Sequence, residues 1–158
     1  MRHTISVLVE NKFGVLARIA TLFAARGFNI DSLAVGETEM PDISRMTIVV
    51  RGDDRILEQV EKQLNKLVDV IKVFDFKEAQ HLERDLALIK VKADKTNRSE
   101  ILQIADIFRA KIVDVSPESI VIEMTGDEEK IQALINLIKP FGIREVCRTG
   151  IIAIGRGK

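Results

Sequence analysis

Two successive parts of the chain carry the same order of hydrophobic patterns, and this repetition limits the possible folds more than any other feature. Between Ile5 and Phe76 the order is strand, helix, strand, strand, helix, strand, and it starts again between Leu86 and Ile154. The two parts share the pattern but not their sequences. A βαββαβ order predicts a four-stranded antiparallel sheet with two helices on one face, the ferredoxin-like arrangement. We therefore predict an α+β protein made of two such units.

Each predicted element is supported by its periodicity and by the residues at its ends. Runs of β-branched residues indicate strands, and apolar residues three or four positions apart indicate helices. Gly27 suits the positive φ that often follows a helix. Asp53 and Asp127 are plausible helix caps. The predicted strands are 5–9, 29–37, 45–51, 70–76, 86–93, 111–115, 119–125 and 146–154, and the predicted helices begin after Gly14, after Asp53, at Asn97 and after Asp127.

The polar stretch 77–83 separates the two parts of the chain. We predict a first domain over residues 1–76, a linker over 77–83 and a second domain over 84–158. A ferredoxin-like sheet leaves its second face and its edge strands open, and these must be covered by the other domain or by a partner chain. The first and third strands are apolar on both faces. This pattern favours a homodimer.

Composition and charge narrow the classes of function. Lys plus Arg and Asp plus Glu each total 24, so no overall positive field attracts nucleic acid or an anionic membrane. No apolar stretch approaches the ~18 residues of a membrane span, and we expect a cytoplasmic protein. All seven aromatic residues are Phe, and none lies in strands 5–9 or 45–51, where an RNA-binding sheet needs stacking residues. We predict no nucleic-acid and no membrane partner.

The sequence contains no recognisable catalytic constellation. His3, His81 and Cys147 are too scattered for a metal site or a nucleophile triad. The tail Gly155–Lys158 resembles a phosphate loop only superficially, because it lacks the spacing and the following helix, and we interpret it as a frayed tail. We therefore predict that this chain carries no catalytic residue, no metal and no cofactor.

The turn before the first helix is the best candidate for a binding site. A helix start presents free N–H groups and the positive end of the helix dipole, which suits a carboxylate. Gly14 lets a ligand approach this end closely. Asn11 either caps the helix or binds the ligand, and the residues alone leave both interpretations open. If the edge strand that begins at Asn29 pairs with its twin in a dimer, Asn29 and Ile30 reach the partner's Asn11–Gly14 turn.

Several segments, taken together, resemble one protein family. They match in order and spacing over nearly the whole chain. The N-terminal half resembles an ACT domain, the amino-acid-sensing module of many metabolic enzymes, and the whole chain is similar to the small regulatory subunit of acetolactate synthase. The segments are Ser6–Asn11, Gly14–Arg18, Arg26–Leu33, Ser44–Ile48, Glu58–Leu64, Lys66–Val70, Glu83–Leu86, Ile107–Val115 and Arg148–Gly150.

This resemblance implies a function and a partner. Such subunits bind the large catalytic subunit, raise its activity and confer feedback inhibition by valine, in some members by leucine or isoleucine. Thiamine diphosphate, magnesium and often FAD belong to the catalytic partner. The family also forms homodimers that hold the effector between two ACT domains. The resemblance therefore implies an effector site formed by Asn11, Lys12, Phe13, Gly14, Val15, Leu16, Asn29 and Ile30.

One departure from the family pattern affects this site. Many members have polar or small residues where Lys12 and Phe13 stand, so Phe13 is expected to influence effector preference. One methylene in a pocket wall changes selectivity by about 1–3 kcal/mol. Two other functions remain as alternatives: a free-standing ACT-type sensor that controls another enzyme or a transcription factor, and a small enzyme on the ferredoxin-like fold.

Overall fold

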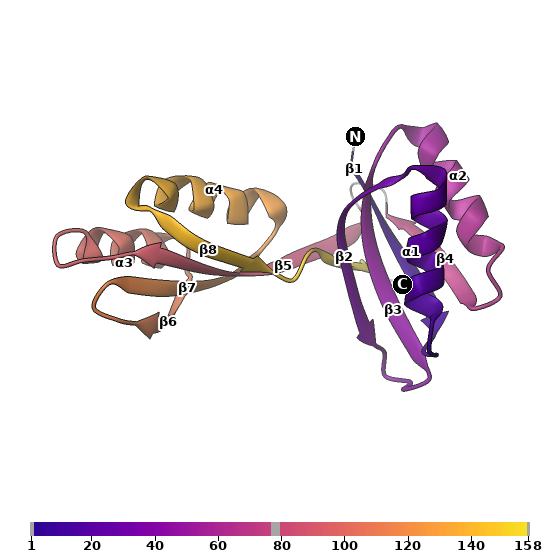
Figure 1. The fold of residues 1–158 in the computed structure, drawn as a ribbon, viewed down its shortest axis with the longest axis horizontal. Helices are drawn as coiled ribbons and strands as arrows, with labels where there is room; N and C mark the ends of the chain where they lie inside the picture. The colour runs from indigo at the N-terminus through magenta and orange to yellow at the C-terminus, as the bar shows by residue number, and fades with distance from the viewer. Residues whose placement is uncertain (1, 77–79, 158) are drawn as a thin grey trace. The chain divides into compact units, whose positions relative to one another are not determined.

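A computed structural model of the chain describes residues 2–76 and 80–157. It divides into two compact units (Figure 1). The first unit comprises Met1–Leu82 and Ile151–Lys158, and the second comprises Glu83–Gly150. The helices of the described residues are all too short or too polar to cross a membrane.

The first unit contains one antiparallel sheet with the strand order β2-β3-β1-β4, and two helices pack on one of its faces. This order confirms the predicted ferredoxin-like topology. The strands pair in register from Arg2↔Arg51 to Glu10↔Ile43 between β1 and β3. The elements are β1 (Arg2–Glu10), α1 (Val15–Arg26), β2 (Asn29–Glu37), β3 (Ile43–Arg51), α2 (Asp54–Asn65) and β4 (Val70–Phe76).

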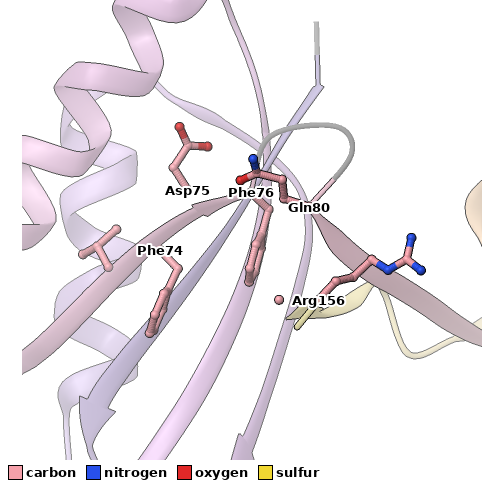
Figure 2. Close-up of a pocket in the computed structure, with 7 residues that line it drawn as sticks. Phe74, Asp75, Phe76, Gln80 and Arg156 are labelled. Atoms are coloured by element: carbon pink, nitrogen blue, oxygen red, sulfur yellow. The ribbon is translucent and has the colours of Figure 1, made fainter. Parts of the chain in front are cut away.

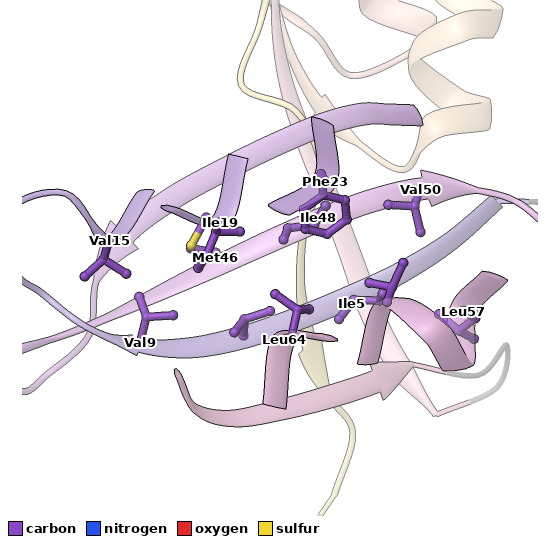
Figure 3. Packing of buried hydrophobic residues seen from close by; sticks show 12 residues of the cluster. Ile5, Val9, Val15, Ile19, Phe23, Met46, Ile48, Val50, Leu57 and Leu64 are labelled. Atoms are coloured by element: carbon purple, nitrogen blue, oxygen red, sulfur yellow. The ribbon is translucent and has the colours of Figure 1, made fainter. Parts of the chain in front are cut away.

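The core of the first unit follows from the two hydrophobic periodicities. Ile5 and Val9 alternate along β1 and face the helices, because successive strand residues point to opposite faces. Phe23 of α1, Ile48 of β3 and Leu64 of α2 meet them in one cluster (Figure 3). Each such side chain contributes about 1.5–3 kcal/mol when it leaves water. The helix spacing and the strand alternation therefore specify the same interior.

The second unit repeats this topology with different residues. Its sheet has the order β6-β7-β5-β8, and Ile89, Ile101, Ile122 and Leu134 are fully buried between the sheet and its helices. The elements are β5 (His81–Lys92), α3 (Arg98–Ile107), β6 (Lys111–Val115), β7 (Ser119–Gly126), α4 (Glu128–Ile138), a 3₁₀ turn (Lys139–Phe141) and β8 (Ile143–Arg148). Both predicted units are therefore present.

The two predicted aspartate caps are confirmed. The Asp53 side chain accepts a hydrogen bond from the Ile56 N–H at 3.0 Å, and the Asp127 side chain accepts one from the Lys130 N–H at 2.8 Å. Each bond satisfies one of the N–H groups that a helix start leaves without a partner.

We expect Asp127→Ala to lower the free energy of unfolding by about 1 kcal/mol, because the cap of α4 is lost. Urea denaturation followed by circular dichroism measures the change. Asp106→Ala is the control, since Asp106 is exposed near the end of α3, and a surface change of this kind stays within about 0.5 kcal/mol. Equal stability of Asp127→Ala and the parent chain would show that this cap is not needed.

The domain boundaries differ from the predicted ones at two places. Strand β5 begins at His81, so residues 81–83 of the predicted linker are strand, and 77–79 lie outside the described residues. The final strand β9 (Ile152–Gly155) pairs with β5 and belongs to the first unit, not to a second domain that continues to residue 158. The reason is that β9 pairs with β5, and just after β9 the Arg156 N–H donates to the carbonyl oxygen of Gln80, which directly precedes β5, at 2.9 Å.

Strand β9 also covers part of the helix-free face of the first sheet. It contacts β1, whose two edges are already paired with β3 and β4. Since the helices occupy the opposite face, β9 lies on the helix-free side, and Ile151 and Ala153 are 3% and 6% exposed there. The apolar second face was predicted to favour a dimer, but the chain itself supplies part of its cover.

Candidate functional site

The turn between β1 and α1 leaves the start of the helix open. Gly14 occupies the cap position with φ of 86°, a left-handed conformation that favours glycine, and no side chain caps the helix. The Val15 N–H makes only a long bond to the Lys12 carbonyl oxygen, at 3.4 Å. The positive end of the helix dipole therefore faces the surroundings with N–H donors available to an anionic group.

Asn11 does not cap this helix, so that interpretation of its side chain is wrong. Its amide Nδ2 donates to the Pro41 carbonyl oxygen at 2.9 Å and to Glu37 Oε1 at 3.3 Å. Its backbone N–H donates to the Asp42 carbonyl oxygen at 2.8 Å. Asn11 thus ties the β1–α1 turn to the connection between β2 and β3, and the helix end stays uncapped.

The neighbouring predicted site residues differ widely in exposure. Phe13 is 103% exposed and Leu16 is 47% exposed, so both present apolar surface beside the open helix end. Val15 is 3% exposed and belongs to the core. Only its backbone can face a ligand. Lys12 Nζ lies 3.0 Å from Glu10 Oε2, which offsets its charge.

Asn29 and Ile30 lie at the opposite end of the same sheet. Asn29 pairs with Arg51, and Arg51 pairs with Arg2 at the first residue of β1, whereas the Asn11–Gly14 turn follows the last residue of β1. A strand of nine residues separates its ends by about 26 Å. One chain therefore does not bring the two predicted halves of the site together.

The Asn29 end carries a compact charged cluster. Asp31 Oδ2 lies 2.7 Å from Arg51 Nε and 3.2 Å from Arg2 Nε, and Asn29 Nδ2 donates to Asp31 Oδ1 at 3.2 Å. The hydrogen bond from Arg51 lowers the pKa of Asp31 below its usual value, with help from the charges of both arginines. These contacts hold Asn29 at the start of β2.

The structure also contains a groove that the sequence analysis missed. It has a volume of about 740 Å³ and is lined by parts of β4 and of the chain around Gln80 and Arg156, with Phe74 and Phe76 side by side (Figure 2). Arg45 and Lys72 lie 5.4 Å and 4.8 Å from the Phe74 ring centre. In the sequence, the alternating residues Phe74 and Phe76 could have indicated an aromatic surface here. The groove itself also needs residues from the end of the chain.

The interpretation of the tail as frayed is wrong for Gly155 and Arg156. Gly155 is the last residue of β9, and the Arg156 N–H donates to the Gln80 carbonyl oxygen at 2.9 Å. The scattered His and Cys residues do not converge: among the described residues, no group of three His, Cys, Asp or Glu side chains can hold a metal ion.

Comparison with known proteins finds two family profiles that match the chain. Over residues 5–72 the chain matches the family profile described as an AHAS small subunit-like ACT domain, and over residues 84–157 it matches the profile described as the small subunit of acetolactate synthase. The first unit is therefore a regulatory module of the ACT class. Together the two matches span most of the chain, and the chain belongs to the acetolactate synthase small-subunit family.

Individual relatives agree with this assignment. The chain is 59% identical over 157 residues to a probable acetolactate synthase small subunit of Archaeoglobus fulgidus, which covers 99% of this chain and 98% of the relative. It is 56% identical over 155 residues to the acetolactate synthase small subunit of Mycolicibacterium smegmatis, covering 98% and 91%. A crystal structure of the Thermotoga maritima small subunit superposes with a TM-score of 0.93 at 48% identity, covering 100% of this chain and 99% of that one.

Proposed function

We propose that this chain is the regulatory subunit of an acetolactate synthase. It binds the large catalytic subunit, raises its activity and makes it sensitive to feedback inhibition by valine or another branched-chain amino acid. The observation that carries this proposal is the match of both units to the same small-subunit family. Thiamine diphosphate, magnesium and FAD then belong to the catalytic partner, and the complex acts in the cytoplasm.

The open start of α1 supports amino-acid binding at this position. The helix N–H groups and dipole suit the effector's carboxylate, and Gly14 leaves room for it. Exposed apolar surface from Phe13 and Leu16 is available for a branched aliphatic side chain. Burying such a side chain contributes about 1.5–3 kcal/mol. That Phe13 tunes the choice among valine, leucine and isoleucine remains a prediction.

A homodimer unites the two halves of the effector site. Strand β2 is an edge strand of the first sheet, so its unpaired side can add the β2 of a second copy. Antiparallel pairing about Leu33 sets Asn29 of one chain opposite the partner's Glu37. In the partner, the Glu37 carboxylate contacts Asn11. Asn29 and Ile30 then stand beside the partner's Asn11–Gly14 turn, and the sensor is the dimer.

Regulation then follows from two states of this dimer. The effector stabilises the state in which the catalytic subunit is less active. Because binding free energies are linked, productive engagement of the catalytic subunit must weaken effector binding by the same factor. A coupling of about 1–3 kcal/mol corresponds to a 5- to 150-fold change in affinity.

Reconstitution tests the proposed function. We expect the purified chain to form a complex with the acetolactate synthase large subunit of the same organism, to raise its rate of pyruvate condensation, and to make that rate sensitive to valine. Gel filtration and the condensation assay measure these effects. The absence of a complex would favour a free-standing sensor, and turnover of pyruvate by the chain alone would favour an enzyme.

A further inference from the structure

Glu37 is a carboxylate at the candidate site with no cationic partner. It is exposed at the end of β2, and among the described residues no Lys, Arg or His lies within ion-pair distance of it. Three other acidic residues near the strand ends of this sheet do form ion pairs. Those pairs are Glu10 with Lys12, Asp69 with Arg18 at 2.6 Å, and Asp31 with Arg2 and Arg51. The negative charge of Glu37 is therefore available to a ligand.

Asn11 holds this carboxylate in place and adds a second acceptor. The Asn11 amide nitrogen donates to Glu37 Oε1 and to the Pro41 carbonyl oxygen. Both donors of the amide are thus used, while its Oδ1 accepts no hydrogen bond from the described residues. The Glu37 carboxylate and Asn11 Oδ1 form a pair of neighbouring acceptors.

Asn11 connects groups of opposite charge, because its amide contacts the Glu37 carboxylate and its backbone leads into the turn before α1. The uncapped start of α1 offers N–H donors and a positive dipole end, and Glu37 offers a negative charge. An α-amino acid carries a carboxylate and an ammonium group on one carbon atom. The arrangement fits such a zwitterion better than it fits a carboxylic acid or a 2-oxo acid of the same carbon skeleton.

We propose that Glu37 is the counter-charge for the ammonium group of the effector, and that it makes the site select amino acids over their desamino analogues. This inference rests on the proposed function, since it assumes that an amino acid binds at the Asn11–Gly14 turn. A hydrogen bond between two charged groups is among the strong polar contacts of proteins. A ligand without the ammonium leaves this carboxylate without its partner.

The test compares Glu37→Gln with Glu39→Gln in the full chain. Glutamine keeps the size of the side chain and an oxygen acceptor for Asn11 but removes the charge. Glu39 is also exposed, two residues further along, and serves as the matched control. Calorimetry measures the binding of valine and of 3-methylbutanoate, which is valine without its amino group, and gel filtration measures the dimer.

We expect Glu37→Gln to weaken valine binding by about 10- to 100-fold, the loss of one charged hydrogen bond. Binding of 3-methylbutanoate stays unchanged, Glu39→Gln behaves like the parent chain, and the variant remains dimeric. Unchanged valine binding in Glu37→Gln would overturn the proposal. So would an equal loss for both ligands, or dissociation of the dimer, which would make Glu37 a contact to the partner's arginines at the Asn29 end.

The Gly14→Asp variant separates this proposal from the proposed function. If Gly14→Asp abolishes valine binding and Glu37→Gln does not weaken it, the effector site is correct and only the role of Glu37 is wrong. If the parent chain binds no branched-chain amino acid, the proposed function itself fails, and the role of Glu37 fails with it.

Discussion

Replacing Gly14 by aspartate is expected to abolish inhibition by valine while stimulation of the catalytic subunit survives. The new carboxylate stands at the helix start, where we place the effector's carboxylate. It occupies the same N–H donors and repels the ligand. A Cβ at position 14 would lie 3.7 Å from Arg18 Nη1, which is ordinary van der Waals contact, so the side chain has room, although the φ of 86° strains any residue other than glycine.

The expected loss of valine affinity is at least about 100-fold, because charged hydrogen bonds are lost and a like charge is introduced. Calorimetry on the chain and inhibition assays on the complex measure it. Unchanged valine binding would show that the pocket lies elsewhere.

Two controls separate charge from backbone strain in this experiment. Gly14→Ala adds a Cβ at the same positive φ without a charge. Gly27→Asp makes the same exchange at the other end of α1, where the glycine also has positive φ, at 70°, and a Cβ meets no atom within 4 Å. Each adds strain of roughly 1–2 kcal/mol. We expect valine to inhibit the Gly27→Asp complex as it does the parent complex.

Replacing Arg148 by alanine is expected to lower the free energy of unfolding of the second unit by about 3–5 kcal/mol. Arg148 donates to Asp85 Oδ2 from Nε at 3.0 Å and from Nη2 at 2.5 Å, and Nη2 also reaches Glu128 at 2.8 Å. The Asp85 side chain is 1% exposed. Its remaining contact is the Thr149 hydroxyl, at 3.2 Å. Without Arg148, a buried carboxylate has no cation, which is among the most costly defects in a protein interior.

A double-mutant cycle identifies the cause of that loss. Adding Asp85→Asn to Arg148→Ala removes the buried charge, so the double variant should be more stable than Arg148→Ala alone. Arg144→Ala is the control, because Arg144 is exposed on the same strand, and its effect should stay within about 0.5 kcal/mol. Chemical denaturation measures the parent chain, Arg148→Ala, Asp85→Asn, the double variant and the Arg144→Ala control. If the double variant were no more stable than Arg148→Ala, the buried charge would not explain the loss.

Most of the secondary structure could be predicted because its signals are local. The bounds of β2, β4 and β6 agree with the predicted strands, and α4 begins directly after Asp127 as predicted. Strands β1 and β5 begin earlier than predicted, at Arg2 and His81. Most of their first residues are polar or charged, so periodicity does not mark them, yet their backbones pair with neighbouring strands.

The candidate site was predictable only in part. Gly14 at a helix start is a local signal, and its positive φ agrees with it. The role of Asn11 was not predictable, because its partners Glu37 and Pro41 are 26 and 30 residues away in the chain. No motif in the sequence marks Glu37 as a binding residue. It becomes a candidate binding group only when the fold sets it beside Asn11.

By itself the sequence determined two βαββαβ units, their helices, their strands and the interior side chains. It did so because periods of two and of three to four residues place apolar side chains on one face of each element. Only the tertiary structure decided that β9 returns to the first unit, that Asn11 leaves α1 uncapped, and that Asn29 lies a full strand length from Gly14. These are pairings between distant segments, and each depends on which backbone and side-chain partners the completed sheet brings together.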